Sequence, residues 1–158
     1  MIVLLVSILV IILDQISKYL IRSSLTLYDS IPVIGEFFSL TYVTNKGMAF
    51  GINFPGGTYL FTATSIVLTI IIFIYLWRER NNSALLRMSL AFILAGAIGN
   101  LLDRIVYGEV ADFLDFSFWG YHWYIFNVAD SSVTVGMILF IIYSIIDNAS
   151  KNKIQSND

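Results

Sequence analysis

Apolar residues gather into four long runs, at residues 2–21, 57–77, 84–106 and 128–146. Each run has about the 20 residues that a helix needs to cross the hydrocarbon core of a membrane. The second run holds no charged residue, whereas each of the others carries a few polar side chains. This pattern predicts an all-α membrane protein with four transmembrane helices, folded as a single domain over residues 1–158.

The composition agrees with a chain embedded in a membrane. Hydrophobic residues make up 58% of the chain and charged residues only 13%, against about a quarter charged in soluble domains. The first apolar run is not preceded by a basic segment, and no small-residue cleavage site follows it. We therefore expect that run to be a retained span and not a signal peptide.

Two longer connections, residues 25–55 and 107–127, join the predicted spans. The first is rich in aromatic and β-branched residues and is broken by Gly47 and Gly51, a pattern that predicts short strands. The second is dense in aromatic residues, which suits the headgroup level of a bilayer. We expect a small β-containing region on the membrane surface, built mainly from the first connection.

Basic residues predict how the spans are oriented. Arg78, Arg80 and Arg87 surround the short loop between the second and third runs, and Lys151 and Lys153 lie in the tail. Four further basic residues fall at the opposite side of the membrane: Lys18, Arg22, Lys46 and Arg104. Because basic loops favour the cytoplasm, both termini are predicted to be cytoplasmic and the two longer connections to face outward.

The residues that are missing exclude several kinds of chemistry. The chain has no cysteine and a single histidine, His122, so we expect no disulfide, metal site or other cofactor. The net charge of −2 is too small to indicate a nucleic-acid partner.

Polar side chains inside the predicted spans are costly and therefore informative. Asp14 and Lys18 are four residues apart, so they lie on one helical face and can form an ion pair. A polar stripe with the same spacing runs along the third span through Gly96, Asn100, Asp103 and Arg104. Ala95, Gly96 and Gly99 would allow another helix to approach closely. Each feature therefore has a structural interpretation, as ion pair or helix packing.

Aspartates stand at both ends of the second connection, in two copies of the tripeptide Val-Ala-Asp. Asp130 alone would be interpreted as a helix N-cap, and Asp115 and His122 as solvated or interfacial residues. Asp112 and Asp130, however, flank a connection whose two neighbouring spans end at the same face, so they can meet. Two close carboxylates share one proton near neutral pH, as in aspartic proteases. Spacing alone also allows Asp115 or Asp103 to replace either partner.

Five strings then point to a known family. In order, they are LDQISKYLI (13–21), TNKGMAFG (44–51), AGAIGNLLDR (95–104), GEVADFLDF (108–116) and FNVADSS (126–132). With these motifs the chain resembles the lipoprotein signal peptidase (signal peptidase II) family, bacterial membrane aspartic endopeptidases. The motifs fall on three of the four predicted spans and on both outer connections.

The resemblance implies a catalytic pair at Asp112 and Asp130. The supporting or substrate-binding residues that it implies are Asp14, Lys18, Asn45, Gly47, Asn100, Asp103, Arg104, Asn127 and Ala129. The implied substrate is a prolipoprotein whose cysteine carries a diacylglyceryl group, cut just before that cysteine at the outer face of the bacterial cytoplasmic membrane. Membrane lipids are the other implied partners, the protein is expected to act as a monomer, and the aromatic connection 107–127 would form a lid over the scissile bond.

Two other classes of protein compete with this interpretation. One is a non-enzymatic four-helix carrier or proton-conducting module in which Asp14, Asp103 and Asp130 relay charge. The other is a structural subunit whose polar stripes only hold helices together. A conduction path needs polar groups in both halves of the bilayer, whereas here they gather in the outer half. The sequence therefore favours a site at one face.

Overall fold

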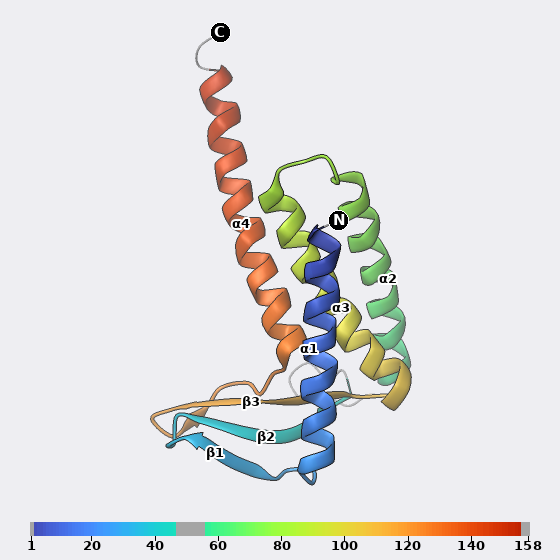
Figure 1. Ribbon diagram of the computed structural model, residues 1–158, viewed down its shortest axis with the longest axis vertical. Helices are drawn as coiled ribbons and strands as arrows, with labels where there is room; N and C mark the ends of the chain where they lie inside the picture. The colour runs from blue at the N-terminus through green and yellow to red at the C-terminus, as the bar shows by residue number, and fades with distance from the viewer. Residues whose placement is uncertain (1, 47–55, 156–158) are drawn as a thin grey trace.

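The computed structural model describes residues 2–46 and 56–155. Its helices are α1 (Ile2–Ser24), α2 (Gly57–Arg78), α3 (Ala84–Tyr107) and α4 (Val128–Gln155). Its strands are β1 (Ser30–Ile34), β2 (Phe38–Asn45), β3 (Val110–Phe118) and β4 (Tyr121–His122). The helices form a bundle, and the sheet lies across one end of it (Figure 1).

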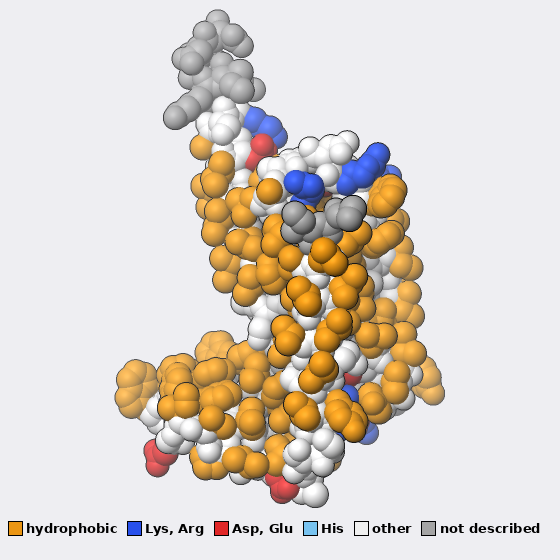
Figure 2. Space-filling model, viewed as in Figure 1, with side chains coloured by type: hydrophobic (Ala, Val, Ile, Leu, Met, Phe, Trp, Pro, Cys, Tyr) orange, Lys and Arg blue, Asp and Glu red, His pale blue; other side chains and the backbone are white. Residues whose placement is uncertain are grey.

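All four helices are long and apolar enough to cross a membrane, so the prediction of four helices with this character is confirmed. The fourth helix continues well past residue 146, where the apolar run ends, and projects beyond the bundle to Gln155. Its polar last turns have no core to cover, so an apolar pattern could not reveal them. Large apolar side chains are exposed along α1, α2 and α4, as expected of surfaces that face lipid (Figure 2).

Helix α3 is the centre of the bundle, because the other three helices all pack against it. A Cβ atom on Gly96 would lie 2.3 Å from the Ala129 carbonyl oxygen, and one on Gly99 would lie 2.6 Å from Asp14 Oδ2. The predicted close approach of other helices to these small residues is therefore confirmed. It brings the start of α4 and the middle of α1 into direct contact with the polar stripe of α3.

A glycine turn connects α3 to the sheet. Gly108 ends the helix with φ 77°, in the left-handed region that favours glycine, and its N–H donates to the Arg104 carbonyl. Strand β3 begins two residues later at Val110. The short turn fixes β3, and with it Asp112, against the end of α3.

The sheet is antiparallel, with strand order β1-β2-β3-β4. Strands β1 and β2 confirm the prediction of short strands for residues 25–46, the described part of the first connection. The connection 107–127, predicted only as an aromatic loop, instead contributes β3, and Val43 on β2 pairs with Asp112. Asp112 and Asp115 interrupt the apolar pattern of this segment, so its sequence does not show the alternation typical of a strand.

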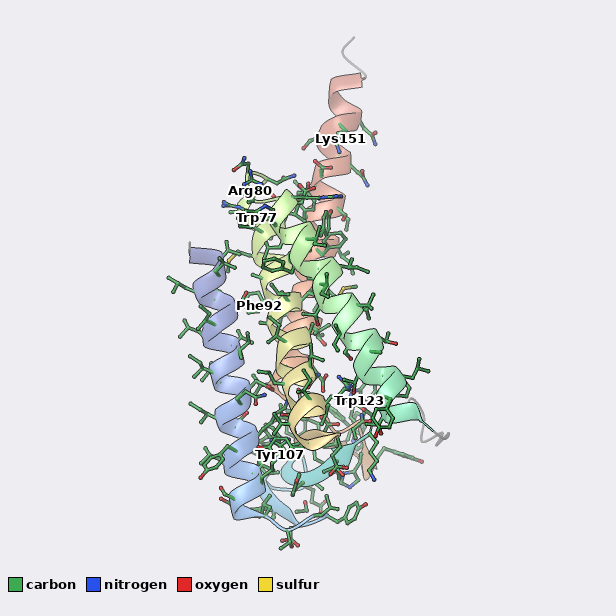
Figure 3. All side chains as sticks on the ribbon, turned by 90° about the vertical axis from the view of Figure 1, so that its right-hand side faces the viewer. Trp77, Arg80, Phe92, Tyr107, Trp123 and Lys151 are labelled. Carbon is green, nitrogen blue, oxygen red and sulfur yellow. The ribbon has the colours of Figure 1, made fainter. Side chains whose placement is uncertain are left out.

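Aromatic side chains mark the sheet end of the molecule. Trp119 and Gly120 form the turn between β3 and β4 with φ values of 51° and 82°, and Trp119 is 96% exposed. Tyr107 and Trp123 lie at this end, whereas Trp77 and Arg80 lie at the opposite end of the bundle (Figure 3). Aromatic groups of this kind are typical of both membrane–water interfaces.

Candidate active site

Asn127, the residue before α4, connects the two aspartates that flank the 107–127 connection. Its side-chain Nδ2 donates to Asp112 Oδ1 at 2.6 Å, and its Oδ1 accepts from the backbone N–H of Asp130 at 2.9 Å. Asp130 Oδ2 in turn accepts from the backbone N–H of Asn127 at 3.3 Å. These reciprocal bonds form a capping box in which Asn127 is the cap. The interpretation of Asp130 as the N-cap is therefore wrong.

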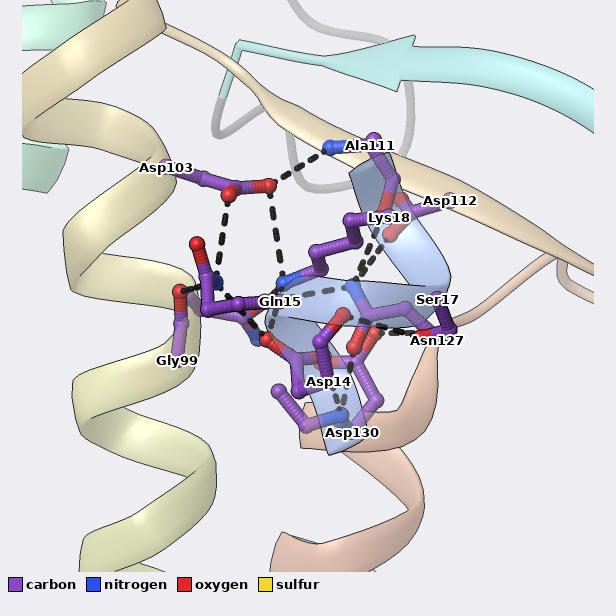
Figure 4. Close-up of polar contacts among 12 residues, drawn as sticks. Asp14, Gln15, Ser17, Lys18, Gly99, Asp103, Ala111, Asp112, Asn127 and Asp130 are labelled. Carbon is purple, nitrogen blue, oxygen red and sulfur yellow. Dashed lines mark hydrogen bonds and ion pairs between the residues drawn. The ribbon is translucent and has the colours of Figure 1, made fainter. Parts of the chain in front are cut away.

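Asn100 of α3 completes the link between the two carboxylates. Its Nδ2 donates to Asp130 Oδ1 at 2.8 Å, and its Oδ1 accepts from Asn127 Nδ2 at 3.1 Å. Two amides, from α3 and from the start of α4, thus hold both acidic side chains in one connected set (Figure 4). Spacing in the sequence predicted that Asp112 and Asp130 meet, and the structure brings them together.

The carboxyl of Asp112 lies in a setting that favours its protonated form. Asp112 is 2% exposed. Burial together with the negative charge of Asp130 raises the pKa of Asp112 to about 7. Hydrogen bonds from Asn127 and Asn45 and the charge of Lys18 act in the opposite direction but do not prevail. A pKa near neutrality is the value that suits a general acid or base.

A buried ionic network lies beneath the two carboxylates. Lys18 Nζ is 2.8 Å from Asp14 Oδ2, 3.5 Å from Asp103 Oδ2 and 2.9 Å from Asn100 Oδ1. Arg22 adds a second cation 2.8 Å from Asp103. Asp14, Lys18 and Asp103 are each 0% exposed, so pairing compensates the high cost of burying their charges. The predicted Asp14–Lys18 pair is confirmed.

The same network holds the backbone next to each of the two site aspartates. Asp14 Oδ1 accepts from the N–H of Ala129 at 2.8 Å, and Asp103 Oδ2 accepts from the N–H of Ala111 at 3.1 Å. Both alanines are 0% exposed. The alanine of each Val-Ala-Asp tripeptide therefore provides a small side chain and a free N–H for these contacts.

Two further residues, Gln15 and Tyr124, belong to the site although the sequence analysis did not single them out. Gln15 Nε2 donates to Asp14 Oδ2 at 3.0 Å and to the Gly99 carbonyl at 3.1 Å. Tyr124 Oη accepts from Asn45 Nδ2 at 2.6 Å. An amide beside Asp14 in an apolar run was a usable signal for Gln15, whereas nothing distinguishes Tyr124 from its aromatic neighbours.

Arg104 lies at the border of the site. Its Nη1 donates to Ser65 Oγ of α2 at 3.3 Å, and its charge acts on both Asp130 and Asp112. Its Nε is buried and has no hydrogen-bond partner among the residues that the structure describes. The guanidinium therefore has a donor available for a ligand. Gly47, also predicted here, lies outside the described residues.

Asp115 and Asp103, which spacing allowed as alternatives in the pair, have other partners. Asp115 accepts from Thr41 Oγ1 at 2.7 Å and lies 2.8 Å from His122 Nδ1. It is 3% exposed, so the interpretation of Asp115 as a solvated residue is wrong, because the sheet covers it. His122 is exposed as predicted. Asp103 is held by Lys18 and Arg22.

A groove beside α4 reaches Asp130. It has a volume of about 630 Å³ and is lined by Asp130, by Trp123 and Tyr124, and by Val133 and Val135 of α4. Its volume lies within the range of roughly 300–1,000 Å³ typical of ligand sites. Among the residues described, no group of three or more His, Cys, Asp or Glu side chains is placed to hold a metal ion.

The fold and the site define a membrane protein of four helices in which asparagine side chains link two aspartates between the bundle and an antiparallel sheet. A family model described as Signal peptidase (SPase) II matches residues 6–146, and the chain belongs to this family. It is thus an aspartic endopeptidase and a multi-pass bacterial membrane protein. The carrier and structural-subunit alternatives are not favoured.

Individual relatives agree with this assignment. The chain is 45% identical to a lipoprotein signal peptidase of Desulforapulum autotrophicum, over 89% of this chain and 90% of the relative. It is 44% identical to one of Halothermothrix orenii (87% and 91%) and 37% identical to one of Staphylococcus aureus (94% and 91%). A solved bacterial membrane enzyme superimposes with a TM-score of 0.80 at 37% identity, covering 94% of this chain and 90% of the other.

Proposed function

We propose that Asp112 and Asp130 are the catalytic pair with which this enzyme removes the signal peptide from prolipoproteins, cleaving just before a diacylglyceryl-modified cysteine. The observation that carries this proposal is the bridge made by Asn127, which contacts both acidic residues. The relatives' name, lipoprotein signal peptidase, supports the substrate class.

The pair holds one proton and acts as a unit. The ionised carboxylate takes a proton from a water molecule, whose oxygen attacks the scissile carbonyl carbon. The protonated carboxyl donates a hydrogen bond to the carbonyl oxygen as the carbon becomes tetrahedral. The C–N bond then breaks, and the leaving amine nitrogen of the cysteine takes up a proton from the pair. Catalysis by this route uses only groups of the chain and water.

The groove provides the path by which a membrane-bound substrate reaches the pair. Val133 and Val135 place one side of it on the surface of α4, and Asp130 lies within it. A lipidated peptide can therefore enter sideways from the bilayer and leave its acyl chains among the lipids. The available Nε of Arg104 is a donor for a substrate carbonyl.

The distribution of charge supports an active site at the outer face of the cytoplasmic membrane. Lys and Arg side chains gather at the end of the bundle opposite the sheet (Figure 2). Basic residues favour the cytoplasm. We therefore propose that the N- and C-termini of the chain are cytoplasmic and that the sheet lies outside. The β3–β4 hairpin with its exposed Trp119 is the proposed aromatic lid. A single chain supplies both aspartates of the proposed pair, so a monomer suffices.

A cleavage assay in detergent tests this function. A precursor peptide with a diacylglyceryl cysteine is compared with the same peptide lacking the lipid, and only the lipidated form should be cut efficiently. Asp112→Asn and Asp130→Asn should each lower turnover by at least about 10³-fold, because a shared-proton pair fails when either member is lost. Asp115→Asn, an equally buried aspartate on the same strand, is the matched control. Near-normal turnover by either of the first two variants would refute the assignment.

A further inference from the structure

A cavity lies between the helices at the end of the bundle opposite the sheet. Helices α1 and α2 both pack on α3 but make no extensive contact with each other within the described chain. Between them is a cavity of about 270 Å³, walled by Val3 and Leu4 of α1 and by Phe73 and Trp77 of α2. Trp77 marks the membrane interface at this end (Figure 3). The walls formed by these residues are apolar. The cavity lies level with the first turn of α1 and the last turns of α2.

Two arginines line the same cavity, Arg80 after α2 and Arg87 in the first turn of α3. Arg87 Nη1 donates to the Arg80 carbonyl at 3.3 Å, and Arg80 Nη1 donates to the Trp77 carbonyl at 3.2 Å. The Arg80 guanidinium also lies 5.3 Å from the centre of the Trp77 ring. These contacts hold both guanidinium groups beside the cavity and leave most of their N–H donors for another acceptor.

No carboxylate among the described residues pairs with the positive charge of this cluster. Neither Arg80 nor Arg87 forms an ion pair with a carboxylate in the part of the chain that the structure describes. The Arg87 Nε is buried and has no hydrogen-bond partner among these residues. A buried guanidinium donor without a partner is costly, so the site is complementary to an anion.

We propose that this cavity binds an anionic phospholipid, with a segment of one acyl chain between α1 and α2 and the phosphate on Arg80 and Arg87. Apolar walls below a pair of arginines match the two parts of such a molecule, and basic pockets between membrane helices bind anionic headgroups. The cavity is smaller than the roughly 300–1,000 Å³ of a site for a whole drug-sized ligand, which suits part of an acyl chain. Arginine also pairs with phosphate through two N–H donors at once.

The bound lipid has a structural role. Because α1 and α2 make no extensive contact with each other within the described chain, an acyl chain between them would add to the packing of the bundle. Leu76 of α2 lines the cavity and belongs to the core cluster that also contains Leu86 and Leu90 of α3. The lipid would thus enlarge that core on the side where Val3 of α1 already packs against it. This proposal concerns the opposite end of the molecule and does not depend on the proposed peptidase mechanism.

Native mass spectrometry of the full chain tests the site. The protein, in detergent, is mixed with equal amounts of phosphatidylglycerol and phosphatidylcholine of the same acyl composition, and retained lipid is counted. One phosphatidylglycerol should be retained in preference to phosphatidylcholine. Arg87→Gln and Arg80→Gln should each lower its occupancy about tenfold, because a charge-assisted hydrogen bond is lost. Leu4→Trp should lower it as well with both arginines intact, because Leu4 is half-exposed and an indole there fills the cavity.

The matched control is Arg78→Gln, which removes the same charge from the same end of α2 but does not line the cavity. Its lipid occupancy should equal that of the unmodified chain. The proposal would be overturned if the two lipids were retained equally, or if Arg78→Gln lost as much lipid as the other arginine variants. It would also be overturned if glycerol phosphate released the lipid, because that would indicate a site for free phosphate. Circular dichroism of every variant establishes that the bundle is folded, and Leu4→Trp tests the cavity independently of charge.

Discussion

The backbone N–H of Ala129 donates a 2.8 Å hydrogen bond to Asp14 Oδ1, a residue 115 positions earlier in the chain. The N–H of Ala111 makes the equivalent bond to Asp103. Each alanine directly precedes one member of the aspartate pair, so carboxylates of α1 and α3 fix the peptide on which each pair member stands. The charged groups inside the spans therefore hold the site in place in addition to joining the helices.

Removing the charge of Asp14 should destabilise the protein and lower its activity together. Asp14→Asn leaves Lys18 buried without its partner at 2.8 Å, and breaking a buried ion pair costs about 3–5 kcal/mol. The second carboxylate near Lys18, Asp103 at 3.5 Å, should keep the loss toward the lower end of that range. Thermal unfolding in detergent measures the stability, and the lipopeptide assay measures the activity.

An exposed ion pair with the same spacing provides the control for this change. Asp147 and Lys151 on α4 are 2.7 Å apart, with Lys151 exposed and Asp147 partly exposed. Asp147→Asn should leave the unfolding temperature nearly unchanged, because surface pairs contribute little. If Asp14→Asn unfolded at the same temperature as Asp147→Asn, the buried network would not have the role that its geometry indicates.

The pH dependence of cleavage should follow the proton on the aspartate pair. Burial and the charge of Asp130 raise the pKa of Asp112 to about 7, and the proposed mechanism needs one proton on the pair. Activity should therefore fall as the pH rises through about 7, which a pH profile of kcat/KM for the lipidated peptide measures. A profile that stayed flat from neutral to alkaline pH would contradict the shared proton.

The stability of the folded protein should also depend on the protonation of Asp112, and it should decrease as the pH rises. The pKa of Asp112 is higher in the folded protein than its usual 3.8, so between 3.8 and about 7 the folded chain holds a proton that the unfolded chain releases. The contribution of Asp112 to stability is therefore fully present at acidic pH and declines as the pH rises across this window. Asp112→Asn should flatten that decline in unfolding experiments at several pH values.

The spans were predictable because the hydrocarbon core demands long apolar helices. The strand β3 was not, since Asp112 and Asp115 break its alternation, and its partner β2 is distant in the sequence. The capping position, which the sequence alone suggests for Asp130, belongs instead to Asn127. Which residue caps a helix depends on where the chain enters the helix. The reciprocal hydrogen bonds between Asn127 and Asp130 that identify the cap are visible only in three dimensions.

The meeting of Asp112 and Asp130 could be predicted because both flank one connection between adjacent spans. The partners that complete the site could not. Tyr124 reaches Asn45 across 79 positions of sequence, and no spacing rule connects two residues on separate outer segments. Gln15 likewise acquires its contacts to Gly99 and Asp103 only when α1 packs against α3.

Gly96→Ala should disturb the aspartate pair although the added methyl group contacts neither aspartate. The new Cβ would lie 2.3 Å from the Ala129 carbonyl oxygen and 2.6 Å from a Val133 methyl, so α4 must shift away from α3. Overpacking of this kind costs about 1–3 kcal/mol, and displacement of Asp130 should lower kcat about 10²-fold. Gly35→Ala is the control, because no atom lies within 4 Å of its added Cβ. It should lose some stability from its φ of 50° but keep its kcat.

The hydroxyl of Tyr124 should contribute to catalysis through Asn45. Its Oη accepts from Asn45 Nδ2 at 2.6 Å, and Asn45 also hydrogen-bonds Asp112, so the phenol orients an amide that contacts the pair. Tyr124→Phe removes one hydrogen bond, worth about 0.5–1.5 kcal/mol, so kcat/KM should fall about two- to tenfold. Because Asn45 lowers the pKa of Asp112, a misplaced amide should also move the alkaline limb of the pH profile to higher pH. Tyr121→Phe, an 81% exposed neighbour on the same hairpin, should leave both unchanged. Equal effects of the two substitutions on rate and pH profile would show that the hairpin acts through its aromatic surface and not through this hydroxyl.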